Sequence, residues 1–552
     1  MASPVSTEPA WLKVFGIPEL AHIICATFRR RDKASLMQVC RPLFCSLLPV
    51  VWEEVDRPDA LVSMIPGGGF LTYDSDLVPY VVMQLPGSLE LSRFNIYAPH
   101  VKRLTLSPIY VDEYDGWGMF LACTQHIDLL PNLEILYLPS PERGHYGHNA
   151  QKVETDSVNW IIAFLSSSLQ TLALTPPEVR HFAQYTNIPW LDFSSFDGLM
   201  TSVAQKCPQL RSLNILPRDF RKRVPTPGRN YRPLPQGLFP YKPSEICSNL
   251  LHLSNLTSLL ASPAILYPEA MITLSGLPCL ESLCVVGWEY EYEVHCNHLQ
   301  LPIKSFPVLK HLELNRLSWS TIANLCNATP LISGLQSMTI AYPAVSNVGS
   351  DEKTYKSLSD IIPLLATNNS IITTLTVHEY GSRQISPEIL NAWSRLPLVN
   401  LHLGWSVIDY CGFDVLYSIL SCLPLLEVLE LSLTQDPLYL KQMREIVDLL
   451  PRLRRLRIPV KWESIFELAQ RDFIPCQSES YHDLCLKSNF YLPEPQQESA
   501  ERLARYLFIL RPMARVICEA HKTGFYRYDT YEYVDQGPKD MVNVELSRLR
   551  FK

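Results

Sequence analysis

The sequence predicts an α/β protein in which a short three-helix module at the N-terminus precedes an irregular solenoid of strand–helix units. Three observations support this prediction. A leucine phrase recurs along most of the chain, segments with a helical period separate its copies, and residues 16–56 carry three short apolar helices of their own. At 552 residues the chain exceeds the roughly 250–300 residues that one core usually serves. A stack of repeats accommodates this length, because each repeat packs only against its neighbours.

The recurring phrase is approximately Pro-x-Leu-x-x-Leu-x-Leu, and its second half alternates as a strand with one buried face does. From Leu280 onward the copies lie about 26 to 37 residues apart, whereas the first four are more widely spaced, which implies insertions. The copies are at 101–106, 131–138, 169–174, 208–215, 278–285, 307–314, 335–340, 372–377, 398–403, 426–431 and 453–458.

Helices are predicted between these strands, and a proline often follows where a helix must stop, as at Pro208, Pro424 and Pro451. One strand plus one helix at this period is the leucine-rich-repeat pattern, with a curved parallel sheet and helices on its convex side. The repeat often places Asn or Cys three residues after the last leucine, where the side chain bonds the turn. Ile109 and Leu317 stand there instead, so we expect the turns to be satisfied differently. The predicted helices cover 158–165, 199–206, 358–365, 413–420 and 440–450.

The three predicted N-terminal helices make a small core. Pro18 fits the first turn of the first helix, Asp32 is expected at the N-cap of the second, and Trp52 ends the third. The order of short motifs here resembles an F-box: Ile-Pro at 17–18, an apolar pair at 23–24, Val-Cys-Arg at 39–41 and Val-Trp at 51–52. With its repeats, the whole chain resembles the fungal F-box-like proteins that have degenerate leucine-rich repeats.

This resemblance implies a non-enzymatic substrate-recognition subunit of an SCF-type cullin–RING ubiquitin ligase, which docks a Skp-family adaptor through residues 16–56 and an unknown target protein through the repeats. Two alternatives remain open at this point. The module could simply cap the open end of the solenoid, and the chain could be a protein-interaction scaffold unrelated to ubiquitination. A cap would turn its apolar face inward, whereas a docking module would leave an apolar patch exposed. The residues expected to face the adaptor are Ile17, Pro18, Leu20, Ile24, Val39, Cys40 and Leu43.

The target is expected to bind the sheet face that carries the third and fifth residues of each phrase. These residues are mostly polar in the middle of the chain and basic at its last copy. Aromatic and arginine side chains dominate binding hot spots, so they are the favoured anchors. The residues proposed on this ground are Tyr137, His311, His402, Arg455 and Arg457.

The remaining segments complete the predicted organisation. Residues 1–15 are expected to form a tail, 57–95 a linker, 96–462 the solenoid and 463–552 a C-terminal capping region. Residues 217–243 carry seven prolines and seven basic residues, which predicts an inserted extended loop within the solenoid.

Composition and motifs argue against several classes of partner, cellular location and chemistry. The net charge of −7 gives no overall attraction to nucleic acid or anionic lipid, and no apolar run is long enough to span a bilayer. The N-terminus lacks a secretory signal, so the fifteen cysteines are expected to be reduced thiols in a cytoplasmic and/or nuclear protein. Glycine-loop nucleotide motifs, nucleophile elbows and paired zinc-ligand motifs were not found, so no cofactor, metal or catalytic residue is expected.

Overall fold

The computed structural model of the chain describes most of its residues in two compact units, Met1–Leu280 and Glu281–Lys552, which we treat separately. Most of the loop predicted at 217–243 lies outside the described residues. The described residues are 14, 17–73, 80–106, 111–138, 150–173, 191–215, 217–218, 248–287, 299–341, 358–368, 371–378, 390–404, 412–431, 437–474, 483–488, 492–518 and 537–551.

The first unit begins with three short helices, as the sequence predicts. Pro18 opens the first of them, while Asp32 lies in the first turn of the second, whose N-cap is Arg29 rather than Asp32. A two-residue strand then joins the module to the repeats, because β1 pairs in parallel with β4 through Val55 and Leu104. The elements are α2 (Pro18–Ala26), α3 (Arg30–Met37), α4 (Arg41–Trp52), β1 (Glu54–Val55) and β4 (Arg103–Thr105).

Residues 57–95, expected to be a linker, instead contribute to a small separate sheet of order β2-β3-β5. The antiparallel strands β2 and β3 come from this segment, and β5 joins β3 in parallel. Nearly every residue of β2 is exposed, so it lacks the alternation by which a half-buried strand is recognised in sequence. The elements are α5 (Pro58–Val62), β2 (Gly69–Tyr73), β3 (Tyr80–Gln84) and β5 (Glu113–Asp115).

The repeats of the first unit form parallel strands in the order β1-β4-β6-β7-β9-β11, with helices between them in the chain. Short 3₁₀ turns also occur in this unit, at Phe94–Ile96, Ala98–His100, Asn249–His252 and Pro263–Leu266. The further elements are α6 (Trp117–Thr124), β6 (Ile135–Tyr137), α7 (Ala150–Phe164), β7 (Thr171–Ala173), β8 (Leu191–Asp192), α8 (Phe193–Lys206), β9 (Ser212–Asn214), β10 (Pro217–Arg218), β11 (Ser258–Ala261) and α10 (Pro268–Leu274).

The second unit repeats the same architecture in the order β12-β13-β14-β15-β16-β17-β19-β21-β22. The described residues therefore carry fifteen parallel repeat strands, six in the first unit and nine in the second. The strands are β12 (Ser282–Val286), β13 (His311–Asn315), β14 (Ser337–Ala341), β15 (Thr374–His378), β16 (Asn400–Leu403), β17 (Val428–Leu431), β18 (Leu438–Tyr439), β19 (Arg455–Arg457), β20 (Val460–Lys461), β21 (Cys485–Ser488) and β22 (Arg515–Cys518).

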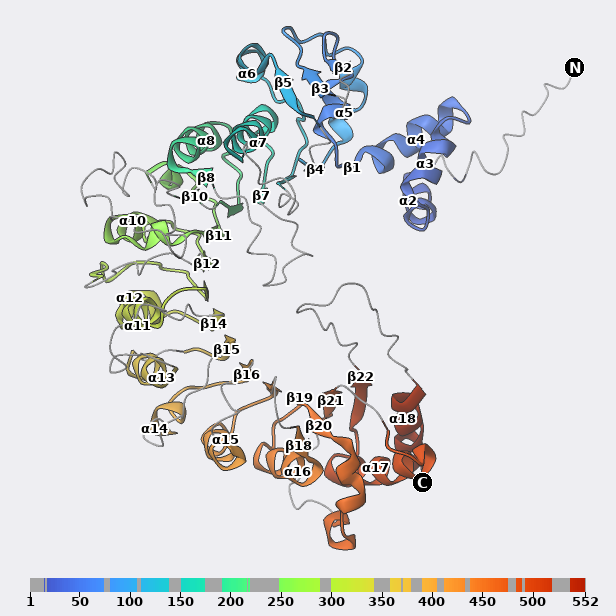
Figure 1. The fold of residues 1–552 in the computed structure, drawn as a ribbon, viewed down its shortest axis with the longest axis vertical. Helices are drawn as coiled ribbons and strands as arrows, with labels where there is room; N and C mark the ends of the chain where they lie inside the picture. Colours follow the sequence, from blue (N-terminus) through green and yellow to red (C-terminus); the bar gives the residue numbers. More distant parts are fainter. Residues whose placement is uncertain are drawn as a thin grey trace, which may run out of the picture. The chain divides into compact units, whose positions relative to one another are not determined.

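Figure 1 shows the helices of the second unit along one side of these strands. The helices are α11 (Trp319–Asn327), α12 (Thr329–Ile332), α13 (Leu358–Thr367), α14 (Leu390–Trp393), α15 (Gly412–Ser421), α16 (Leu440–Leu449), α17 (Gln496–Leu510) and α18 (Gly537–Arg550), with 3₁₀ turns at Trp462–Glu467 and Gln470–Phe473. Within the described residues, no helix combines the length and apolar character needed to cross a bilayer.

Alternation along each strand decides which side chains form the core. In β17, Leu429 and Leu431 are buried, whereas Val428 and Glu430 are only half-buried on the opposite face. Neighbouring strands are in register, so leucines stack on leucines from one repeat to the next: Leu401 aligns with Leu429, and Leu429 with Leu456. We call the face opposite the helices, which carries the alternate residues, the open face.

Backbone hydrogen bonds follow the strands, where the repeat often has Asn or Cys. The N–H that follows a strand donates to a carbonyl of a neighbouring strand, as Leu106 N does to Tyr137 O (2.8 Å). Asparagines earlier in the phrase bond across repeats: Asn132 Nδ2 donates to Pro99 O (2.7 Å), and Asn255 Nδ2 donates to Pro208 O (2.9 Å). These exposed asparagine bonds link neighbouring repeats.

The sheet extends past residue 462, where the sequence placed the last repeat, because β21 and β22 add two more parallel strands. Helix α18 then ends the sheet. Val516 N donates to Asn543 Oδ1 (3.0 Å), and Asn543 Nδ2 donates back to Val516 O (2.9 Å). The asparagine amide thus bonds the outer strand as a further strand would.

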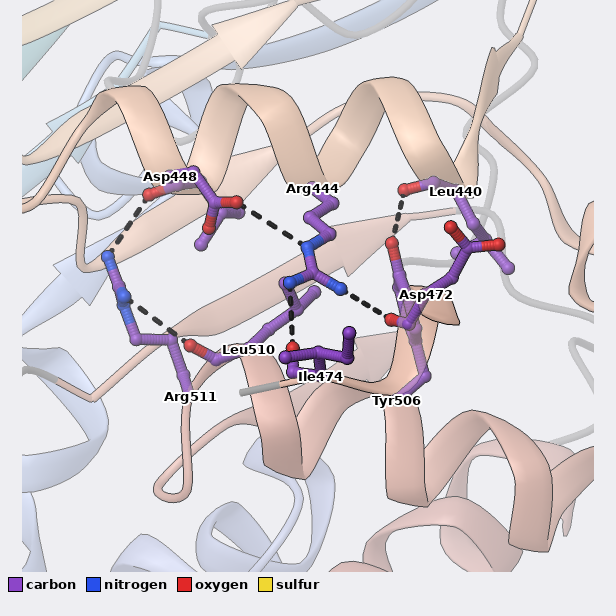
Figure 2. A network of polar contacts seen from close by, with 9 residues as sticks. Leu440, Arg444, Asp448, Asp472, Ile474, Tyr506, Leu510 and Arg511 are labelled. Carbon is purple, nitrogen blue, oxygen red and sulfur yellow. Dashed lines mark hydrogen bonds and ion pairs between the residues drawn. The ribbon is translucent and has the colours of Figure 1, made fainter. Parts of the chain in front are cut away.

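Polar side chains fasten the C-terminal helices to α16 (Figure 2). Buried Arg511 donates through Nη2 to Val447 O (3.1 Å), at the C-terminal end of α16 where carbonyls lack helical partners. Tyr506 Oη donates to Leu440 O (2.6 Å), and Arg444 Nη2 donates to Ile474 O (2.7 Å). These bonds fix the C-terminal segment on the last repeats.

Candidate functional site

Helix α2 presents an apolar face to solvent. Leu20 and Ile23 are 39% and 63% exposed, and Ile24 beside them is half-buried. Spacings of three and four residues put these side chains on one side of the helix. Ile17, at the N-cap, is also exposed. The result is an exposed apolar patch at the start of the chain, of the kind that marks an interaction site.

The other side of α2 forms the core of the module. Ala21 and Cys25 pack with residues of α3 and α4, including Leu43, Leu47 and Leu48. Leu43, which the sequence placed on the adaptor-facing surface, is only 4% exposed and belongs to this core. The same helix therefore holds the module together with one face and leaves the other uncovered.

Val39 and Cys40 form the turn that joins α3 to α4. Val39 is 65% exposed, and Cys40 is half-buried at the N-cap of α4. Pro18 starts α2, although its side chain lies outside the described residues. Of the residues expected to face the adaptor, Ile17, Leu20 and Val39 are exposed.

The module also contacts the first repeat. The rings of Trp52 and Tyr97 lie 4.5 Å apart between centroids, and Arg103 Nη1 bonds Glu54 Oε1 at 2.5 Å. Its strand β1 covers one edge of β4, as a cap would. The module therefore combines two features: β1 covers the edge of the repeat sheet, and α2 exposes an apolar face.

The second candidate surface is the open face of the last repeats in the second unit. Strand register aligns His402 with Glu430 and Glu430 with Arg457, so three of its side chains form one row across β16, β17 and β19. Arg457 Nη1 lies 3.5 Å from Glu430 Oε2, and His402 Nδ1 lies 3.6 Å from the same oxygen. His378, at the end of β15, meets His402 edge to face with ring centroids 4.7 Å apart.

Burial keeps both imidazoles neutral. It lowers the pKa of His402 to about 4, and the positive charge of Arg457 acts in the same direction. Burial likewise lowers the pKa of His378 to about 4, with the neighbouring His402 adding to the effect and Glu430 opposing it. Since His402 is neutral at pH 7, its contact with Glu430 is not an ion pair there, and Arg457 supplies the charge that balances this carboxylate.

A glycine makes room for the histidine pair. A Cβ atom on Gly404 would lie 2.4 Å from His378 Nδ1 and 3.3 Å from His378 Cα, so a side chain at this position would displace the ring. Gly404 N donates to Val377 O (2.7 Å), which places the glycine backbone directly beside β15.

The other predicted target-binding residues are more dispersed. Arg455 is exposed on the same strand as Arg457, whereas His311 lies three strands from His402 and in the other row of side chains. Tyr137 is half-buried on β6 of the first unit. The structure therefore brings together His402, Arg455 and Arg457, and adds Glu430 and His378, which the sequence analysis did not propose as binding residues.

Metal-ligating groups and buried thiols were compared among the described residues. No group of three or more His, Cys, Asp or Glu side chains among them is arranged to hold a metal ion. Burial raises the pKa of the Cys207 and Cys326 thiols to about 12, which keeps both in the unreactive protonated form.

Comparison with known proteins gives no family assignment. The chain matches no protein-family model, and no curated protein is significantly similar to it.

Proposed function

We propose that this protein is the substrate-recognition subunit of an SCF-type cullin–RING ubiquitin ligase, with the N-terminal module docking a Skp-family adaptor and the repeats holding a target protein. The observation that supports this most is the division of α2 into a buried face and an exposed apolar face. A helix needed only as a cap has no reason to keep Leu20 and Ile23 in water, since burying them would stabilise the fold.

The proposed role of the chain is to bring the target protein close to the transfer machinery. It would hold the target near a ubiquitin-transfer centre on other subunits, and bond making would be theirs. The sheet's open face suits this role, because its polar side chains stand in rows across many strands and can make many small contacts with a protein surface.

Adaptor docking is tested with the variant Leu20→Asp/Ile23→Asp in the full-length chain. Both side chains are exposed, so the fold should survive, whereas two carboxylates on the docking face would have to be desolvated. We expect affinity for a purified Skp-family adaptor, measured by calorimetry, to fall by at least about a hundredfold, as for the loss of two hot-spot residues.

The matched control is Met119→Asp/Leu251→Asp, which makes the same chemical change at two exposed apolar positions elsewhere in the first unit. It should bind the adaptor as the unchanged chain does. If the unchanged chain does not bind the adaptor while its circular dichroism shows a folded protein, the ligase role is wrong and the repeat-scaffold alternative remains.

A further inference from the structure

The last three strands of the second unit carry a cluster of positive charge on the open face. Strand β19 contributes Arg455 and Arg457, β21 contributes Lys487 and β22 contributes Arg515. Arg455 and Arg515 are exposed, and Arg457 and Lys487 are half-buried. Arg455 and Arg457 were expected on this face from the sequence, whereas Lys487 and Arg515 lie on strands that the sequence did not predict.

Strand register places the four cations in two adjacent rows. Arg455 aligns with Cys485 and Cys485 with Arg515 in one row, while Arg457 aligns with Lys487 in the other. Parallel strands lie about 4.8 Å apart, so the cluster extends for about 10 Å across the sheet. We call these four residues the basic end.

Part of this charge is paired within the described residues. Glu430 balances Arg457 at 3.5 Å, at the border with β17, and Glu427 is paired with a different arginine, Arg454, at 3.6 Å. Asp483 is exposed just before β21. The chain as a whole carries a net charge of −7, so the basic end is a local feature and not part of a generally basic surface.

We propose that the basic end binds an acidic segment of the target protein, one with several Asp or Glu carboxylates in an extended run. This proposal extends the proposed function by naming the chemistry of the target. Several cations spread over about 10 Å match several separated negative charges better than one compact group. Three of them are arginines, whose planar guanidinium groups bind carboxylates through paired hydrogen bonds.

A nucleic acid is the weaker candidate for the same charge. Single-stranded nucleic acids are usually held by aromatic side chains on which bases stack, in addition to cations. In the basic end the side chains between the cations are Cys485, which is buried, and Ile517, which is half-buried. Among the described residues of these strands, neither side chain is a stacking platform, so this surface favours a peptide.

The test uses the full-length protein without adaptor and a fluorescein-labelled peptide of alternating Glu and Ala, followed by fluorescence anisotropy. We expect the peptide to bind and the matching Gln–Ala peptide not to bind. Raising the salt from about 0.1 M to about 1 M shortens the screening length from about 10 Å to about 3 Å, so binding should weaken strongly. Arg455→Glu/Arg515→Glu should weaken binding at least about tenfold, because two attractions become repulsions.

The matched control is Arg395→Glu/Arg471→Glu, which reverses two exposed arginines of the same unit that lie outside the sheet strands. It should bind the Glu–Ala peptide normally, and so should Leu20→Asp/Ile23→Asp, which separates this surface from adaptor docking. The proposal is overturned if the Glu–Ala peptide fails to bind at millimolar concentration, if the Gln–Ala peptide binds equally, or if both arginine variants weaken binding alike. A single-stranded oligonucleotide that binds more tightly than the peptide and loses affinity in Arg455→Glu/Arg515→Glu would also overturn it, in favour of a nucleic-acid partner.

Discussion

Acidification from pH 7 to pH 5 tests the electrostatics of the histidine pair in the second unit. His378 and His402 have pKa values of about 4 in the folded protein, against an ordinary value of 6.5. The unfolded chain therefore binds more protons than the folded protein when the pH lies between these values. As the pH falls through 6.5 toward 4, the free energy of unfolding must decrease, and above about pH 7.5 the pair makes almost no contribution to this slope.

The size of the effect follows from the two pKa values. At pH 5 an ordinary histidine is about 97% protonated, whereas one with a pKa of about 4 is about 9% protonated. Integrated from pH 7 to pH 5, this difference costs about 2 kcal/mol for each imidazole and about 4 kcal/mol for both. The side chain of His402 is 24% exposed, so solvent screening leaves most of this cost in place.

Urea unfolding of the full-length chain at pH 7, 6 and 5 and constant ionic strength measures the slope. His378→Asn/His402→Asn serves as the reference, because it keeps every other titrating group and removes only the pair. The unchanged chain should lose about 4 kcal/mol more than the variant between pH 7 and pH 5. Equal losses in the two proteins would refute the claim that burial keeps these imidazoles neutral.

Three further substitutions test the packing around this face and the C-terminal cap. Gly404→Ala should lower the free energy of unfolding by about 1–3 kcal/mol in urea, because the new Cβ would overlap the ring of His378; an unchanged value would contradict the close approach. Tyr506→Phe should cost about 1–2 kcal/mol, since the carbonyl of Leu440 loses its buried donor, whereas no change in thermal unfolding would show that water replaces the hydroxyl. Arg511→Ala should cost about 3 kcal/mol by leaving a cavity and unbonded carbonyls at the end of α16, and should increase amide exchange in α16 ahead of global unfolding; equal exchange would argue against this role.

The repeat architecture could be predicted from the sequence because one buried face imposes alternation. Leu429 and Leu431 alternate with Val428 and Glu430, and this pattern fixes which side of β17 enters the core. Prolines marked the helix ends equally well, as Pro451 does after α16. Strands β21 and β22 were missed, because Cys485–Ser488 and Arg515–Cys518 lack the leucine triplet of the phrase.

The candidate surfaces were harder to predict, since exposure depends on tertiary packing. Ile23 and Leu43 are both apolar residues at helical spacing, yet one is exposed and the other lies in the module core. Only the packing of α2 against α4 decides between them. Lys487 and Arg515 could not be assigned to a surface while their strands were unrecognised, so only Arg455 and Arg457 of the basic end could be proposed from sequence.

A stack of similar strand–helix units has no inherent length, because the N–H and C=O groups of its outermost strand can always bond a further strand. The amide of Asn543 occupies both peptide groups of Val516 on the outermost strand of the second unit. A barrel has no free edge because its first and last strands pair, and here one side chain bonds the edge strand instead. Because the N–H and C=O of Val516 are already bonded, a strand from another chain cannot pair with β22 at this residue. Chains are therefore kept from joining end to end at this position.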